Sequence, residues 1–328
     1  MPLVSVVMVC HRNTPYVRPA VDSIFDQTLS DWEFIFVSNG SGLAPSDLGA
    51  MGSDPRLRWV ELSENMGISH GLNAGIEVVT GDYVGFLDSD DIALPARLER
   101  QVALMQSDPL LGLVNCGVMT IDDTGRVTGR EFVLIEGDAQ QVFSAYYSST
   151  ITSAFMVRRE VAKQYNLRPD FTTGVDYDFF SRIGDQWRMG GVPEVLLHYR
   201  RHLQQITVES RDEQVLNECI VRLATARRRS GREEELAELS AEFGAWRQQP
   251  PKQSVTFAAF ARRYLSEGYP TIAVYHVRKL LGVDRGPRAL FFAGKVLGAA
   301  VVREPLSTWW FLRLFFTGPV RAHGLRPF

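Results

Sequence analysis

The chain has 328 residues, 45% of them hydrophobic, so it can bury one large core and still carry a smaller second region. Its formal net charge of -3 gives no support for binding to nucleic acid. The three cysteines are widely spaced and form neither a disulfide framework nor a zinc pattern, which predicts a reducing, cytoplasmic environment. No stretch reaches the roughly 20 consecutive apolar residues that a membrane-spanning helix needs.

Apolar runs with the length of strands alternate with helical patterns in the first part of the chain. The run at 4–10 has no basic leader and continues into a polar loop, so it predicts a strand rather than a signal peptide. This order of elements predicts a parallel α/β sheet with right-handed crossovers. Ligands of such sheets bind beyond the carboxyl ends of the strands, so the loops at 11–14, 38–42 and 88–91 are expected to converge. The other strands are predicted at 33–37, 58–62, 83–87, 113–122, 126–132 and 153–157, and helices after Pro15, over 71–79 and over 95–105.

An acidic stretch follows the buried run at 83–87. Asp88, Asp90 and Asp91 lie within four residues, and such carboxylates repel one another unless a cation lies among them. Oxygen ligands of this kind suit Mg2+ or Mn2+, which commonly share a diphosphate with the protein. On its own, the stretch is also compatible with a solvated acidic turn that caps the next helix.

Three ordered stretches together resemble a family 2 glycosyltransferase of the GT-A fold. They read VSVVMVCHRNTPYVRPAVDSIFDQTLSDWEFIFVSNGSG, ENMGISHGLNAGI and GDYVGFLDSDDIALPARLE. The resemblance implies a Rossmann-like, mostly parallel sheet with flanking helices, in a catalytic domain over 1–206. A helical region is expected over 207–328. The resemblance also implies a nucleotide diphosphate sugar as donor and Mn2+ or Mg2+ as cofactor.

The resemblance assigns the donor-binding residues one by one. Val9 and His11 correspond to the strand and loop that hold the base and ribose. Asn39 occupies the position of an Asp that accepts from the base; its amide oxygen can accept from a uracil N–H, but the amide also adds a donor. A plain turn at Asn39 is the alternative, and the identity of the base stays open. Asn65 and Asn73 match the family's NxGxxxxxN stretch.

The metal-binding residues are implied in the same way. Asp88, Asp90 and Asp91 match the family's DxD-type motif, with Asp91 expected as the direct metal ligand and Asp90 near the ribose or the metal. His202 ends a segment similar to the family's YRRH. It either completes the metal shell or lies exposed on an edge strand.

The catalytic base is expected at Asp176, because residues 174–182 (GVDYDFFSR) resemble the family's EDYDLWLR stretch. In an inverting transfer this carboxylate takes the proton of the acceptor hydroxyl as the hydroxyl attacks the anomeric carbon opposite the leaving group. Capping of the following helix is the alternative role for Asp176. Asp178 is expected to be a structural acid, solvated or paired with Arg.

Two further positions depart from the family. Leu72 stands where many members have a phosphate-binding Arg, and Val175 replaces a Glu. These departures support an alternative function, a catalytically inactive nucleotide-sugar-binding or assembly protein of the same fold. A sugar nucleotidyltransferase would need a Gly-rich basic loop after the first strand, and residues 11–13 are not one.

The absence of a QxxRW motif around 204–207 favours transfer of a single sugar. The expected reaction moves it from a UDP-sugar to a hydroxyl of a saccharide or lipid-linked acceptor, in cell-surface polysaccharide or glycolipid synthesis.

Charged amphipathic patterns replace the strands after residue 206. Helices are predicted at 213–229, 233–243 and 288–302, with a helical pair over 257–281 and a proline-containing linker at 248–253. Aromatic residues gather in 306–316, and from Arg285 onward the basic residues outnumber the acidic ones. Two interpretations stay open: peripheral contact with the inner face of the cell membrane, or packing on the catalytic domain or a second copy in a homodimer. The basic residues are Arg285, Arg288, Lys295, Arg303, Arg313, Arg321 and Arg326.

Overall fold

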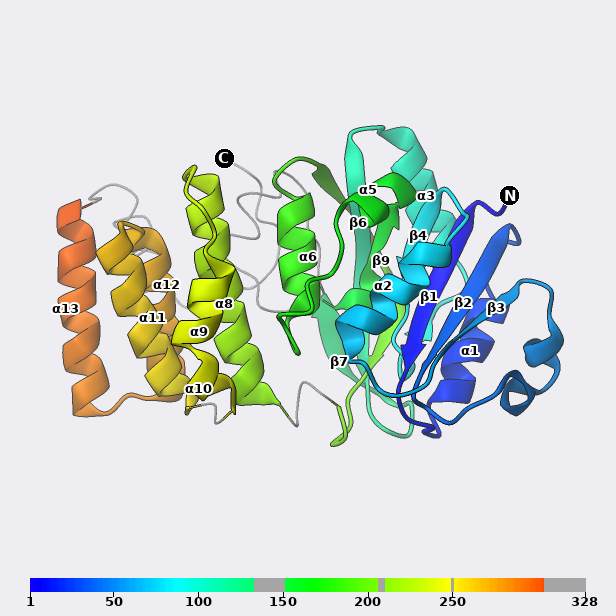
Figure 1. Cartoon of the computed structure of the whole chain (residues 1–328), viewed down its shortest axis with the longest axis horizontal. Coiled ribbons are helices and arrows are strands. Elements are labelled where there is room, and N and C mark those ends of the chain that lie inside the picture. The colour runs from blue at the N-terminus through cyan, green and yellow to red at the C-terminus, as the bar shows by residue number, and fades with distance from the viewer. Residues whose placement is uncertain (133–150, 206–209, 249–250, 304–328) are drawn as a thin grey trace. The chain divides into compact units, whose positions relative to one another are not determined.

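A computed structural model describes residues 1–132, 151–205, 210–248 and 251–303. These residues divide into two compact units (Figure 1). The first holds the described residues up to Gln205 and consists of a sheet with helices around it. The second holds the described residues from Ser210 on and is entirely helical.

The first half of the sheet is parallel, as predicted. Its strands lie in the order β3-β2-β1-β4, and β1 is buried along its whole length because helices cover it on both faces. The predicted crossovers are present between these strands. The elements are β1 (Val4–Cys10), α1 (Val17–Phe25), β2 (Trp32–Asn39), a 3-10 segment (Pro45–Ser53), β3 (Leu57–Leu62), α2 (Ile68–Val78) and β4 (Tyr83–Phe86).

The second half of the sheet is mixed. β8 lies antiparallel between β4 and β6, β9 runs parallel to β6, and β5 and β7 add antiparallel pairs. Because β8 is antiparallel to β4, the start of β8 lies beside the end of β4. The elements are β5 (Ile92–Ala93), α3 (Arg97–Ser107), β6 (Leu111–Ile121), β7 (Val127–Phe132), η2 (Thr152–Ala154), β8 (Met156–Arg158), α5 (Arg159–Gln164), α6 (Val175–Ile183) and β9 (Arg188–Arg200).

Two glycines let α2 lie close against the sheet. A Cβ on Gly71 would lie 2.6 Å from a methyl group of Val9, and one on Gly75 would lie 2.4 Å from a methyl group of Val7. Larger residues would push α2 away from β1. The close approach therefore fixes the helix that carries Asn73 over the carboxyl ends of β1 and β2.

The core stripe predicted for α3 is confirmed, but the same helix also buries a charge. Leu98, Val102 and Met105 are buried, and so is Arg97, which is fully inaccessible to solvent. The Arg97 guanidinium donates from Nη2 to the carbonyl oxygens of Phe86 and Phe155, at 2.7 and 3.3 Å. It therefore ties the end of β4 to the segment before β8.

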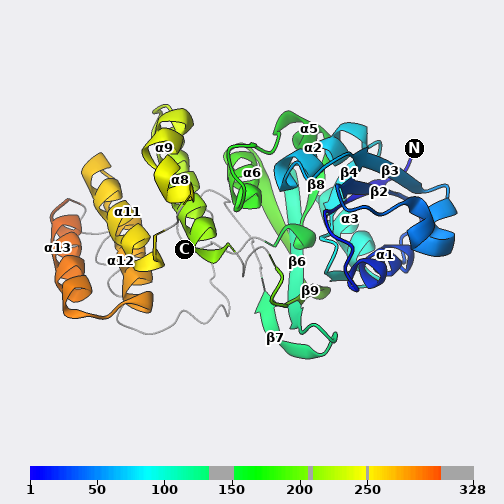
Figure 2. The same cartoon turned by 60° about the horizontal axis from the view of Figure 1, so that its bottom comes forward.

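The helical unit contains the predicted helices, with boundaries that follow from its turn residues. Gly268 adopts a positive φ of 90° after α11, and Pro270 begins α12, so the predicted helical pair divides there. α11 packs against α8 and α12, and α12 packs against α13 (Figure 2). The helices are α8 (Arg211–Arg229), α9 (Leu236–Glu242), α10 (Gly244–Gln248), α11 (Gln253–Glu267), α12 (Pro270–Val283) and α13 (Pro287–Arg303).

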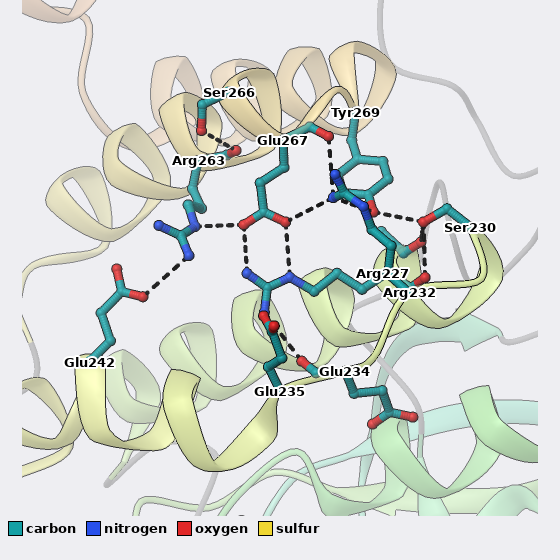
Figure 3. A network of polar contacts seen from close by, with 11 residues as sticks. Arg227, Ser230, Arg232, Glu234, Glu235, Glu242, Arg263, Ser266, Glu267 and Tyr269 are labelled. Atoms are coloured by element: carbon teal, nitrogen blue, oxygen red, sulfur yellow. Dashed lines mark hydrogen bonds and ion pairs between the residues drawn. The ribbon is translucent and has the colours of Figure 1, made fainter.

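An ionic network joins α8 to the end of α11 (Figure 3). Glu267 accepts two hydrogen bonds from Arg227, at 2.9 and 2.7 Å, and one from Arg263 at 2.6 Å. Burial alone would raise the pKa of Glu267, but these guanidinium groups outweigh it and lower the pKa. The network is internally compensated, which indicates a structural role.

No helix among the described residues is both long and apolar enough to cross a membrane. The aromatic segment 306–316 and the basic residues beyond Arg303 lie outside the described residues.

Candidate active site

The acidic loop 88–91 follows the carboxyl end of β4, as predicted, and its last residue is its most buried. Asp91 is fully inaccessible to solvent. Its Oδ2 accepts a hydrogen bond of 2.6 Å from the Ser153 hydroxyl, and its Oδ1 accepts one of 2.9 Å from the Arg200 main-chain N–H. Both carboxylate oxygens of the residue predicted as direct metal ligand are thus engaged by the protein itself.

Asp90 and His202 form a close pair at the more open side of the loop. Asp90 Oδ2 lies 2.9 Å from His202 Nε2, and the two side chains are 24% and 8% exposed. The His202 ring contacts the ring of Tyr16, with centroids 4.7 Å apart, and the guanidinium of Arg200 lies 4.8 Å from the same tyrosine ring. The structure therefore places His202 against Asp90 rather than on an exposed edge.

The raised pKa of Asp88 shows that the acidic loop carries excess negative charge. Burial raises the pKa of the Asp88 carboxyl to about 7, and the charges of Asp90 and Asp176 contribute to the increase. Burial and the charges of Asp90 and Asp88 likewise hold the pKa of Asp91 well above its usual range. A cation would relieve this repulsion.

Asp176 lies in the first turn of α6, close enough to Asp88 for its charge to contribute to that shift. The N-cap position of α6 belongs to Gly174, and no side chain caps the helix there. Asp176 Oδ1 instead accepts a hydrogen bond of 2.9 Å from the N–H of Tyr177. Asp176 is therefore not the N-cap residue, but its side chain does accept from one of the main-chain N–H groups that the first turn of α6 leaves without a helical partner.

Asp178 has the structural role expected from the sequence. Its side chain is 2% exposed and pairs with Arg182 at 3.0 Å and with Arg168 at 3.5 Å. These two cations compensate its charge.

Asn39 ends β2 and its side chain organises the next loop. The amide nitrogen donates to Asn65 Oδ1 at 3.2 Å and to the carbonyl oxygen of Gly67 at 3.1 Å. Its Oδ1 accepts from the N–H of Met66 at 2.9 Å. Asn39 therefore does more than form a turn: it holds the loop that carries Asn65 against the end of β2.

Asn73 and Leu72 lie on α2 in different surroundings. The Asn73 amide exchanges two hydrogen bonds with the main chain of Leu167, at 2.8 and 2.9 Å, and so anchors the segment that leads to α6. Leu72 is buried in the core, so the position carries no charge toward a phosphate. Val9 and His11 lie at the end of β1, which runs parallel to β2 and β4 on either side.

Sequence reasoning missed three residues around the acidic loop. Ser153 and Arg200 hold Asp91, and the buried guanidinium of Arg97 lies near the charges of Asp88 and Asp91. Ser153 was the first residue of a predicted strand and Arg200 lay within the YRRH-like segment, so neither residue was assigned a role of its own. No sequence signal distinguishes Arg97 from a surface arginine.

The residues present fit a cation that binds together with a diphosphate. No group of three or more His, Cys, Asp or Glu side chains in the described part of the chain is arranged as a complete metal site. Mg2+ and similar ions often take only one or two protein carboxylates, the other ligands being phosphate and water. Adjacent ligands of an octahedron with bonds of about 2.1 Å lie about 3.0 Å apart. Asp90 Oδ2 and His202 Nε2 lie 2.9 Å apart because they are hydrogen-bonded, and a cation that took both as ligands would replace this hydrogen bond.

Two solved structures share the fold over nearly the whole chain. S. aureus TarS 1–349 in complex with UDP-GlcNAc superposes with a TM-score of 0.58 at 12% identity, covering 93% of this chain and 91% of that one. A mannosyltransferase from Pyrobaculum calidifontis in complex with GDP-Man and Mn2+ gives a TM-score of 0.53 at 18% identity, covering 96% and 84%. At such identities the likeness shows the fold alone, which is the GT-A fold of glycosyltransferases.

Sequence comparisons then identify the family. The model of glycosyl transferase family 2 matches residues 5–165. An uncharacterized glycosyltransferase of Methanocaldococcus jannaschii is 30% identical over 206 residues, which are 61% of this chain and 71% of that protein. An O-antigen biosynthesis glycosyltransferase of Escherichia coli is 29% identical over 208 residues, 61% of this chain and 80% of that protein. The chain belongs to glycosyltransferase family 2, which confirms the resemblance seen in its motifs.

Proposed function

We propose that the protein is an inverting, metal-dependent glycosyltransferase that moves a single sugar from a UDP-sugar to a hydroxyl of a saccharide or lipid-linked acceptor. One observation carries the proposal: Asp176 and Asp90 both lie within electrostatic reach of Asp88, so the expected base and the expected donor-binding acids share one site. The named role of the Escherichia coli relative in O-antigen biosynthesis supports a function in cell-surface polysaccharide synthesis.

Asp90 and His202 are the residues that would hold the cation. When bound, Mn2+ or Mg2+ would supply positive charge for the diphosphate that leaves. Asp90 keeps a partly exposed carboxylate for this role, whereas Asp91 is fully buried. We assign Asp88 to the donor side of the same cluster.

Asp176 takes the proton in the proposed transfer. The acceptor hydroxyl oxygen forms a bond to the anomeric carbon while the bond from that carbon to the diphosphate oxygen breaks, and the hydroxyl proton passes to the Asp176 carboxylate. Because attack and departure occur on opposite faces, the configuration inverts in one displacement. Asn73 supports this step indirectly, because it anchors the segment that leads to α6.

Asn39 serves the nucleotide in two ways in this proposal. Its amide nitrogen holds the loop with Asn65, and its Oδ1 has a second lone pair beyond the one that Met66 N–H uses. That lone pair supplies the acceptor that a uracil N–H requires. Val9 and His11 would flank the base and ribose.

The decisive experiment is calorimetric titration of the full chain with UDP and GDP, each with and without Mn2+. We expect UDP to bind more tightly in the presence of Mn2+, and the Asp90→Ala variant to lose this enhancement. The control is Asp22→Ala, which removes an acid on α1 that is 44% exposed. If Mn2+ strengthens neither nucleotide, the metal-dependent transfer is wrong. If nucleotides bind but no UDP-sugar is ever hydrolysed or transferred, the protein is a nucleotide-sugar-binding relative.

We also propose that the C-terminal helices contact an anionic membrane surface. On α13, Leu290 and Phe291 are 54% and 68% exposed, and the side chain of Lys295 lies 4.7 Å from the Phe291 ring. Apolar side chains beside cations suit the interface of a membrane that carries negative charge. Phe291→Asp should release the protein from anionic liposomes in a flotation assay, whereas exposed Val127→Asp in the other unit should not. Equal flotation of all three proteins would contradict this contact.

A further inference from the structure

The acidic loop is held by a small set of hydrogen bonds between segments that are distant in the sequence. Asp91 accepts from Ser153 at 2.6 Å and from the Arg200 main chain at 2.9 Å. The same serine hydroxyl accepts from the N–H of Asp88 at 2.9 Å, and the Arg200 side chain donates from Nε to the carbonyl oxygen of Asp90 at 2.9 Å. Two residues outside the loop therefore hold it at three positions.

The sheet topology explains why these segments meet. β8 is antiparallel to β4, with Gly85 opposite Met156, so the residues just before β8 lie beside the residues just after β4. β9 is antiparallel to β5, with Ile92 opposite His198, so the end of β9 lies beside the end of the acidic loop. The mixed half of the sheet thus places Ser153 beside the start of the acidic loop and Arg200 beside its end.

The three residues are buried, and both carboxylate oxygens of Asp91 already accept hydrogen bonds from the protein. Asp91 and Ser153 are fully inaccessible to solvent, and Arg200 is 5% exposed. A buried carboxylate is expensive unless donors satisfy it, and here the donors come from the protein itself. Arg200 Nη1 also donates to the carbonyl oxygens of Asp122 and Asp123, at 3.0 and 3.3 Å, so its own position is fixed.

We propose that Asp91, Ser153 and Arg200 are positioning residues that hold Asp88 and Asp90 in place, and that Asp91 is not a metal ligand. This inference rests on the proposed function for the role of the two acids that it positions. Its consequence for the site is specific. The main chain of Asp88 and that of Asp90 are held by the two residues that hold Asp91, and His202 follows Arg200 by two positions. The same hydrogen bonds therefore fix the main chain of Asp90 and the position of His202, the two residues expected to hold the cation.

The chain offers a matched control at the opposite end of the same strands. The Ser5 hydroxyl donates to Glu33 Oε1 at 2.6 Å and accepts from the N–H of Gly81 at 2.8 Å. This is the same pair of hydrogen bonds that Ser153 makes, and Ser5 is also fully buried. Ser5→Ala therefore removes the same chemistry at the amino ends of the strands, away from the acidic loop.

The first measurement is Mn2+ affinity by electron paramagnetic resonance, in the presence of UDP, for the full chain. Removing a residue that orients a metal ligand typically costs about 10- to 100-fold in metal affinity. We expect Ser153→Ala and Asp91→Asn each to lose about tenfold. The double variant should lose less than the product of the two single losses, because the two residues share the Ser153–Asp91 hydrogen bond. Ser5→Ala should keep the wild-type affinity. Complete loss of Mn2+ binding in Asp91→Asn, with normal binding in Ser153→Ala, would make Asp91 a ligand and overturn the proposal.

The second measurement needs no metal and separates this proposal from the proposed function. Hydrogen exchange of the peptides that contain residues 86–91 and 198–202 reports whether the bonds to Asp91 order the loop. Ser153→Ala and Asp91→Asn should both speed exchange in the two peptides, and Ser5→Ala should not. Unchanged exchange overturns the positioning role even if the wild type binds Mn2+ with UDP. If the variants exchange faster but the wild type binds neither Mn2+ nor UDP, the positioning of the loop is supported and the proposed function is wrong.

Discussion

The two ends of the central strands hold their carboxylates in similar ways but with opposite electrostatic results. At the amino ends, Glu33 accepts from the Ser5 hydroxyl and, at 2.6 Å, from the N–H of Thr80. Burial alone would raise the pKa of Glu33, but these hydrogen bonds outweigh it and hold the pKa below its usual value. At the carboxyl ends, Asp91 accepts from Ser153 and from a main-chain N–H, yet its pKa is raised well above the usual range.

The difference lies in the neighbours rather than in the hydrogen bonds. Glu33 has donors around it, whereas Asp91 is fully buried and shares its surroundings with Asp88 and Asp90. Hydrogen bonds stabilise a carboxylate, but they do not offset deep burial combined with further negative charges. Carboxylates with pKa values raised in this way cluster at functional sites, and here the nearby guanidinium of Arg97 does not offset the increase. Glu33 is satisfied by its donors, while a cation would relieve the repulsion in the acidic loop.

The largest expected effect concerns Asp176, the expected catalytic base beside the acidic loop. Asp176→Asn keeps the shape of the side chain but cannot take a proton, so kcat should fall by about 100- to 10,000-fold. UDP affinity with Mn2+ should barely change, because Asp176 is not assigned to the donor. Steady-state kinetics with a UDP-sugar and calorimetry give the two quantities.

The control for this variant is Asp170→Asn, which changes an exposed acid in the segment before α6. It should keep the wild-type kcat. A loss of UDP affinity together with kcat in Asp176→Asn would show instead that Asp176 binds the donor.

The second effect concerns stability at the amino ends of the strands. Glu33→Ala removes the acceptor for Ser5 and Thr80, which should lower the free energy of unfolding by about 2 to 3 kcal/mol. The pKa of Glu33 is lowered in the folded state, so its contribution is present above the ordinary pKa and is lost as the pH falls through the folded value. Urea unfolding at about pH 7 and about pH 3 should therefore show a smaller difference from wild type at the lower pH. Mn2+ binding that changed with this variant would contradict the separation of the two ends.

The third effect has the opposite sign. The pKa of Asp88 is raised to about 7, so the folded protein binds a proton that the unfolded chain has lost, and stability falls as the pH rises from about 4 to 7. Without metal at about pH 8, Asp88→Asn should be more stable than wild type by about 2 kcal/mol, after allowance for the screening of a half-buried group. At about pH 4 the advantage should disappear. Thermal unfolding in the presence of a chelator measures the stability difference at both pH values. A stability advantage that did not depend on pH would show that the charge of Asp88 does not cause it.

Much of the fold followed from local patterns, because the parallel half of the sheet is built from consecutive elements. The limits predicted for β1 agree with the structure, and the strand at 83–87 with its acidic end was predicted from composition alone. The antiparallel insertion of β8 could not be predicted in this way, since strand pairing across more than 70 residues leaves no local trace.

The same limit applies to the site. The acids at 88–91 were singled out by their residue types and Asp176 by its resemblance to a family stretch, but their partners come from remote segments. The contacts of Asp91 with Ser153 and Arg200 span 62 and 109 residues along the chain. Asn39 likewise fitted either a base contact or a turn, and its bonds to the loop with Asn65 became visible only in three dimensions.

The smallest effect tests whether the charge of Glu33 matters beyond its hydrogen bonds. The bonds from the Ser5 hydroxyl, the Thr80 N–H and the Thr80 hydroxyl all end on a single oxygen, Oε1, at 2.6, 2.6 and 2.8 Å. Glu33→Gln can keep an oxygen in that place and direct its new amide nitrogen elsewhere. Only the strengthening due to the charge is then lost, which should lower the free energy of unfolding by less than about 1 kcal/mol. Urea unfolding beside Glu33→Ala gives the comparison. A loss as large as that of the alanine variant would mean that the ionised carboxylate, and not the geometry of its donors, stabilises the amino ends of the strands.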